Sequence, residues 1–184
     1  AGFGRAMAGL LLGDSNPLID SGRLTIAQTL GGCGALRMAA EFLKLCSADT
    51  TVWVSNPTWG NHIPLLGGAG LNIKQYSYYS KETHGVDFDA MMEDLQQAKA
   101  GDVVLLHGCC HNPSGADLNI EQWQAVTNLL VDKGLLPFVD IAYQGLGLGL
   151  DKDAAGLRLL AEQVPELIIA ASCSKNFGLY RERT

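Results

Sequence analysis

The sequence predicts an α/β fold, with a mostly parallel sheet and helices on both faces. Three observations support this prediction: short apolar runs recur along the chain, segments with apolar residues three and four positions apart lie between them, and 47% of the 184 residues are hydrophobic. Strands that alternate with helices of this length are typical of right-handed crossovers between parallel strands. The hydrophobic fraction suits one compact domain with a conventional core.

The predicted strands are short apolar runs bounded by turn residues. In chain order they are a short segment at 24–30 and then residues 52–55, 72–79, 102–108, 135–143 and 167–172. The predicted helices fill the intervals and cover residues 34–46, 87–100, 120–134 and 154–164. The first of these helices is expected to begin near Ala35, directly after a glycine-rich turn. Each helix has one apolar face to cover the sheet.

Composition and charge exclude several classes of protein. The chain has 13 basic and 19 acidic residues, a formal net charge of −6 and no long basic cluster, so nucleic acid is not an expected partner. No apolar stretch approaches the ~20 residues that span a bilayer, and we expect no membrane association. The five cysteines form neither a disulfide framework nor a C-x-x-C metal pattern. They are interpreted as reduced thiols of a cytoplasmic protein, and no metal site is predicted.

Polar and aromatic residues follow the predicted strands, where the ligand site of a parallel sheet lies. Gly31-Gly32-Cys33-Gly34 leads into a helix, so its backbone N–H groups favour an anion, and Ser172 and Arg183 are candidate phosphate donors. A plain glycine turn that caps a helix is the alternative. Trp59 could stack on a flat ligand or pack in the core.

Asp140 lies within an apolar run, where an unpaired carboxylate is costly, so it needs a partner. A protonated pyridine nitrogen would serve, as would an ordinary salt bridge or a helix cap. Asn112 and Tyr143 could donate hydrogen bonds to a phenolic oxygen. The histidines nearby could support Asp140 or be core residues with satisfied hydrogen bonds, and these are His62, His107 and His111.

Lys175 ends the last apolar run, where an amine is either a surface charge or a nucleophile. At the same predicted edge lie an anion-binding turn, an aromatic ring and a buried acid. An amine in such surroundings can form an imine with an aldehyde. The combination is more specific than any of its members.

Four segments carry a resemblance to a known family: SNPTWGNH, HGCCHNPSGADL, DIAYQG and SCSKNFGLYRER. In order and spacing they resemble the signature segments of the aspartate/aromatic amino acid aminotransferases, subgroup Iα of the fold-type I pyridoxal phosphate enzymes. The resemblance implies transfer of the amino group of aspartate, glutamate or an aromatic amino acid to a 2-oxo acid. It also implies a homodimeric parent protein, in which residues 1–184 are the central part of the large cofactor-binding domain of a truncated chain.

The resemblance further implies a role for each residue of the site. Catalysis is assigned to Lys175, which forms the Schiff base and carries a proton, with Asp140 and Tyr143. The implied contacts of pyridoxal 5'-phosphate are Gly31, Gly32, Cys33, Ser172 and Arg183 on the phosphate, Trp59 on the ring, Asn112 and Tyr143 on the phenolic oxygen, and Asp140 on the pyridine nitrogen. His62 and His107 are placed behind Asp140. The bonds Asn56–Pro57 and Asn112–Pro113 are expected to be cis.

Some features depart from the family pattern or leave alternatives open. Cys33 stands where the family usually has threonine or serine, and its thiol is a weaker hydrogen-bond donor. The small domain, and one antiparallel strand expected between residues 167–172 and the segment at 24–30, lie outside this chain. A pyridoxal phosphate lyase or decarboxylase and a non-catalytic cofactor-binding fragment remain alternatives. A dinucleotide-binding domain is disfavoured, because GGCGALR lacks the required glycine spacing.

Overall fold

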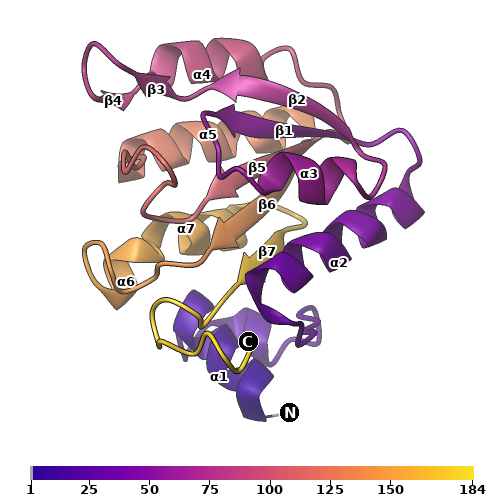
Figure 1. Ribbon diagram of the computed structural model, residues 1–184, viewed down its shortest axis with the longest axis vertical. Helices are drawn as coiled ribbons and strands as arrows, with labels where there is room; N and C mark the ends of the chain where they lie inside the picture. Colours follow the sequence, from indigo (N-terminus) through magenta and orange to yellow (C-terminus); the bar gives the residue numbers. More distant parts are fainter. Residues whose placement is uncertain (1) are drawn as a thin grey trace.

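The computed structural model describes residues 2–184 and contains a five-stranded sheet with the order β2-β1-β5-β6-β7. Every neighbouring pair of strands is parallel. The strands are β1 (Thr51–Asn56), β2 (Asn72–Ser77), β5 (Val103–His107), β6 (Leu136–Ile141) and β7 (Ile168–Ala171). The predicted parallel α/β architecture is confirmed (Figure 1).

Helices cover both faces of this sheet (Figure 1). One face packs against α2 (Gly31–Cys46) and α3 (His62–Gly67). The other packs against α1 (Gly2–Leu12), α4 (Phe88–Leu95), α5 (Ile120–Lys133) and α7 (Ala155–Gln163). The remaining elements are η1 (Pro17–Ile19), α6 (Leu150–Asp153) and a hairpin of β3 (Tyr79–Ser80) and β4 (Gly85–Val86). No helix among residues 2–184 is both long and apolar enough to cross a membrane.

The central strands are buried on both sides, as their continuous apolar sequences predict. In β5, Val103 and Leu105 belong to the core beneath α2 and α3, whereas Val104 and Leu106 belong to the core on the opposite face. All four side chains are at most 1% exposed. This double coverage leaves the strand ends as the place where polar side chains gather.

Four sequence-based predictions are wrong in detail. The segment at 24–30 forms no strand. Helix α2 begins at Gly31 and not near Ala35, because the glycines continue directly into its first turn. The strand predicted at 72–79 ends at Ser77, and the helix predicted at 87–100 ends at Leu95. The sequence also gave no indication of α1 or α3.

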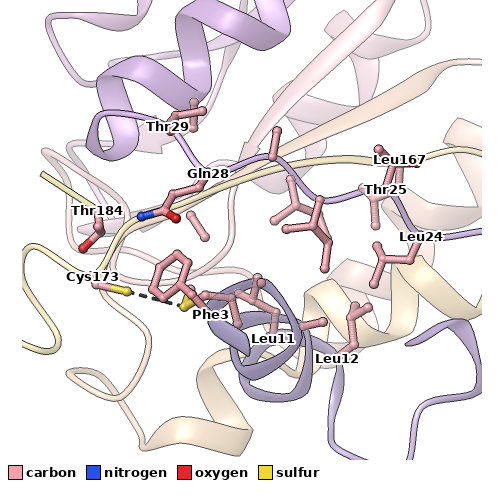
Figure 2. Close-up of a pocket in the computed structure, with 18 residues that line it drawn as sticks. Phe3, Leu11, Leu12, Leu24, Thr25, Gln28, Thr29, Leu167, Cys173 and Thr184 are labelled. Carbon is pink, nitrogen blue, oxygen red and sulfur yellow. Dashed lines mark hydrogen bonds between the residues drawn. The ribbon is translucent and has the colours of Figure 1, made fainter. Parts of the chain in front are cut away.

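Strand β7 lies at the edge of the sheet, with no partner strand on its outer side among residues 2–184. A groove of about 180 Å³ separates it from the segment that precedes α2. The groove is lined by Leu24, Thr25, Gln28 and Thr29 of that segment, by Leu167 and Cys173, and by Phe3, Leu11 and Leu12 of α1 (Figure 2). The Cys173 Sγ lies 3.4 Å from the Met7 Sδ. The groove is therefore mostly apolar.

Candidate active site

A pocket of about 190 Å³ opens at the carboxyl ends of the parallel strands. The predicted residues that line it are Gly32, Cys33, Trp59, His107, Asn112, Asp140, Tyr143, Ser172, Lys175 and Arg183. Gly31 and His62 do not line the pocket but contact residues that do. The topology therefore brings these side chains together from five separate segments of the chain.

Two turns carry pocket residues away from the strand ends. The bonds Asn56–Pro57 and Asn112–Pro113 are both cis, as predicted, and they follow β1 and β5. The second turn is also held by Asp117, whose carboxylate accepts hydrogen bonds from the backbone N–H groups of Cys110 (2.7 Å) and His111 (2.8 Å). Trp59 and Asn112 project from these turns into the pocket lining.

Asp140 finds its partner in a histidine. The side chain is 14% exposed, and its Oδ2 accepts a hydrogen bond of 2.8 Å from the Nε2 of His62, which is fully buried. No lysine or arginine of residues 2–184 forms an ion pair with Asp140. Within residues 2–184 the recorded partner of the Asp140 carboxylate is therefore His62, and not an arginine or a helix N-terminus.

Thr58 links the two predicted supporting histidines. Its Oγ1 lies 2.7 Å from the Nδ1 of His62 and 3.3 Å from the Nε2 of His107. The backbone N–H of Asn112 donates to the Nδ1 of His107 over 3.4 Å. Because an amide N–H only donates and a carboxylate only accepts, this chain of hydrogen bonds runs in one direction, from Asn112 to Asp140. It places the hydrogen of His62 on the nitrogen that faces Asp140.

His107 and His111 are held in their neutral forms. Burial, reinforced by the neighbouring His111 and His62, lowers the pKa of His107 well below 6.5. Burial lowers the pKa of His111 to about 4. His111 contacts Ser55 and Ser114 through its two ring nitrogens and stacks on Tyr78 with 3.9 Å between ring centroids. It is therefore a core histidine with satisfied hydrogen bonds and not a direct partner of Asp140.

The amine of Lys175 lies among aromatic rings. Its Nζ is 4.9 Å from the ring centroid of Tyr143 and 5.9 Å from that of Trp59. Among residues 2–184 no carboxylate forms an ion pair with it. The Nδ2 of Asn112 lies 3.5 Å from the hydroxyl of Tyr143. Lys175 thus faces the pocket and keeps its donors free for a ligand.

The first turn of α2 forms the opposite wall. Gly31 has a φ of 67°, and a Cβ there would lie 3.2 Å from a guanidinium nitrogen of Arg183. A Cβ at Gly32 would lie 3.3 Å from the Cβ of Ser172. Gly31 thus suits a backbone conformation that other residues rarely adopt, and a Cβ at Gly32 would press on Ser172. The first N–H groups of a long helix start at this wall. Arg183 is largely exposed and donates to the carbonyl of Tyr180.

Sequence reasoning missed several residues of the site. Thr58, Cys109, Ser174 and Tyr180 were not singled out, although Cys109, Ser174 and Tyr180 line the pocket. Thr58 stands four positions before His62 in the segment SNPTWGNH. This short spacing was the only sequence feature that could have indicated Thr58 as a hydrogen-bond partner of His62. Cys109 had no signal beyond its place after β5.

Fold and site together define an α/β protein whose pocket combines an amine, a histidine-paired carboxylate and a glycine turn at a helix start, all at one edge of the sheet. The family model of aminotransferases of class I and II matches residues 3–184. The chain belongs to this family.

Individual relatives agree with the family assignment. The chain is 52% identical over 182 residues to an aromatic-amino-acid aminotransferase of Paracoccus denitrificans, covering 99% of this chain and 45% of the relative. It is 54% identical over 181 residues to an aspartate aminotransferase of Escherichia coli, covering 98% of this chain and 46% of the relative. A solved aromatic-amino-acid aminotransferase of Burkholderia pseudomallei, covalently bound to pyridoxal phosphate, superposes with a TM-score of 0.96 at 44% identity, over 98% of this chain and 45% of that one. The chain thus spans slightly under half the length of these relatives.

Proposed function

We propose that the full-length protein is a pyridoxal phosphate-dependent aminotransferase that moves the amino group of aspartate, glutamate or an aromatic amino acid to a 2-oxo acid. The observation that carries the proposal is the position of Lys175. Its unpaired amine faces the same pocket as the Asp140–His62 pair and the glycine turn. The names of the relatives support the same reaction class.

The residues present fit pyridoxal phosphate. The cofactor is flat and carries an anionic phosphate at one end and a ring nitrogen at the other. The glycine turn, Ser172 and Arg183 would hold the phosphate, and Asp140 would meet the ring nitrogen. Trp59 would cover the ring, with Asn112 and Tyr143 on its hydroxyl. Side chains larger than glycine at positions 31 and 32 would crowd this cradle.

Each side chain then has a defined task. When bound, pyridoxal phosphate supplies an aldehyde for amino-group exchange and an electron-withdrawing ring. Lys175 would hold that aldehyde and carry a proton to and from the substrate's α-carbon. Asp140, oriented by His62, would supply a fixed negative charge that keeps the ring nitrogen protonated. Trp59 and Tyr143 would keep water away from the amine.

The proposal extends to the parent protein. Residues 1–184 form the central part of its large domain, with the small domain and one more strand supplied by the remaining chain. The parent acts as a homodimer in the cytoplasm, in amino acid metabolism and biosynthesis. Which amino acid it prefers is left open between the dicarboxylic and aromatic classes, as the relatives carry both names.

The test is an assay of products with the full-length protein. It is incubated with aspartate or phenylalanine and with 2-oxoglutarate as the acceptor. Formation of glutamate in step with the new 2-oxo acid is the expected result. Release of carbon dioxide or ammonia without glutamate would instead assign a decarboxylase or lyase, and cofactor absorbance without any turnover would assign a binding protein.

A further inference from the structure

Two adjacent thiols and a buried carboxylate meet beside the pocket. The sulfurs of Cys109 and Cys110 and a carboxylate oxygen of Asp153 all lie within 4.8 Å of one another. Cys109 and Asp153 are buried, whereas Cys110 is partly exposed. None of the three has a task in the proposed reaction.

We propose that Cys109, Cys110 and Asp153 form a binding site for one thiophilic divalent cation of the Zn²⁺ or Cd²⁺ type. Thiolates select such ions over Mg²⁺ and Ca²⁺, which prefer oxygen ligands. Three protein ligands leave one position of a tetrahedral ion open to water. The partly exposed Cys110 gives the ion a way in from solvent.

Backbone hydrogen bonds orient the Asp153 carboxylate for a role as a metal ligand. Its Oδ2 accepts hydrogen bonds from the N–H groups of Gly145 (2.8 Å) and Gly147 (3.0 Å), and its Oδ1 accepts one of 2.6 Å from Leu148. A carboxylate has about four acceptor positions, so one remains for a metal ion. These three donors hold the carboxylate in place, as outer contacts hold the ligands of known metal sites.

The two cysteines are held in place as well. Cys110 has a φ of 49°, in the left-handed region that residues other than glycine rarely adopt. Asp117 fixes this turn through the backbone N–H of Cys110. The turn therefore presents two neighbouring sulfurs toward Asp153 at the end of α6.

The charge balance permits an ion. Binding of a divalent cation replaces two thiol protons, so the cluster carries a charge of about −1 before and after, which suits a buried place. Glycine at position 147 keeps a side chain away from the ligand atoms, because a Cβ there would lie 2.8 Å from the Oδ1 of Asp153 and 3.1 Å from the Sγ of Cys110. The spacing of the cysteines shows no metal pattern, since the third ligand comes from the end of α6.

The test uses the full-length protein, reduced and freed of metal, with Zn²⁺ alone as the probe. Titration calorimetry and X-ray absorption should detect an ion with two sulfurs at about 2.3 Å and an oxygen at about 2.0–2.2 Å. Cys110→Ser should weaken this binding at least about 100-fold, because even contacts outside the ligand set cost 10–100-fold. Cys46→Ser, which changes an exposed cysteine outside the cluster, is the matched control and should bind as the unchanged protein does.

Gly147→Ala gives a second test that keeps all three ligands and fills the space beside them. It should weaken Zn²⁺ binding at least about 10-fold. Equal affinity in the unchanged protein and in Cys110→Ser, or a spectrum with at most one sulfur, would overturn the proposal. None of these readouts depends on aminotransferase activity, so the metal site and the proposed function can fail separately.

Discussion

The role proposed for Asp140 depends on neighbouring residues that hold its carboxylate in place. His62 donates to it from a fully buried position, and Thr58 holds the second nitrogen of that imidazole. The carboxylate therefore has one fixed orientation before any ligand arrives. Such preorganisation avoids reorganisation during the reaction, which is the main source of electrostatic catalysis.

Replacing Asp140 by asparagine should separate binding from catalysis. In the full-length protein, Asp140→Asn keeps the shape of the side chain and removes the charge. We expect it to fold and bind cofactor but to lose at least about 10²-fold in turnover, the scale of removing one preorganised partner. Steady-state kinetics measure this loss, with the exposed Asp89→Asn as the matched control. Near-normal turnover would contradict the role of Asp140.

His111 should make the protein sensitive to acid. Its pKa is about 4 when folded, against 6.5 for an unperturbed imidazole, so below pH 6.5 the unfolded chain takes up a proton that the folded chain refuses. The contribution of His111 to the free energy of unfolding is therefore fully present above pH 6.5 and is lost as pH falls toward 4. At pH 4.5 this titration lowers the free energy of unfolding by about 2–3 kcal/mol. Denaturant unfolding of the full-length protein at pH 7 and pH 4.5 measures it.

The variant His111→Gln keeps hydrogen-bonding groups for Ser55 and Ser114 but cannot take up the proton. It should lose less stability than the unchanged protein between the two pH values. An identical loss in both proteins would show that His111 does not titrate as described.

Helix α7 packs tightly against α5. A Cβ at Gly156 would lie 2.2 Å from a ring atom of Trp123, closer than any real contact. Helix propensity alone predicts that alanine in place of an interior glycine stabilises a helix by about 1 kcal/mol. Here the indole ring occupies the space, and overpacking a core costs about 1–3 kcal/mol.

Gly156→Ala should therefore destabilise the full-length protein, by about 1–2 kcal/mol in denaturant unfolding. The matched control is Gly67→Ala in α3, where the nearest atom would be 3.8 Å from the new Cβ. That change should be neutral or slightly stabilising. Stabilisation by Gly156→Ala would mean that α5 and α7 are less closely packed than described.

Elements were predictable from sequence where their signals are local. Helix α5 was predicted at 120–134 and found at Ile120–Lys133, since Asn119 and Gln122 form a capping box and Gly134 ends the helix in the left-handed region. Helix α2 has no side-chain cap at Leu30, so its start was misplaced. The segment at 24–30 was misassigned, because strand formation needs a partner that the described chain does not pair with it.

The site likewise contains residues that the sequence predicts and contacts that it does not. Lys175 follows β7 and Asp140 lies near the carboxyl end of β6, so the topology rule for parallel sheets placed them at one edge. The glycine turn reaches the same edge as the first turn of α2. Thr58 lies between His62 at the start of α3 and His107 at the end of β5. The Cys110–Asp153 proximity joins the turn after β5 to the end of α6. Neither relation is encoded in nearby sequence.

At the scale of the whole molecule, β7 and the segment at 24–30 face each other across the groove. The glycine turn follows that segment and Lys175 follows β7, and both line the candidate pocket. Strand β7 has no partner strand on its groove side in the part of the chain that the structure describes, and large apolar side chains are exposed elsewhere, including Leu45 (86%) and Leu148 (80%). Such edges and patches favour association with other chains.

We therefore expect residues 1–184, expressed alone, to aggregate or to bind cofactor weakly and not to transfer amino groups. Co-expression with the remaining chain should restore solubility and activity. Light scattering and the glutamate assay measure both. A monodisperse preparation of residues 1–184 that transfers amino groups would contradict this expectation.

The central claim is that Lys175 holds the cofactor in an aminotransferase. Its most direct test is borohydride reduction of the full-length protein loaded with pyridoxal phosphate, followed by peptide mapping. We predict that the reduced cofactor is found on Lys175, that Lys175→Ala carries none, and that the exposed Lys152→Ala is labelled like the unchanged protein. Cofactor found on Lys152 or Lys44, with Lys175 unmodified, would contradict the account.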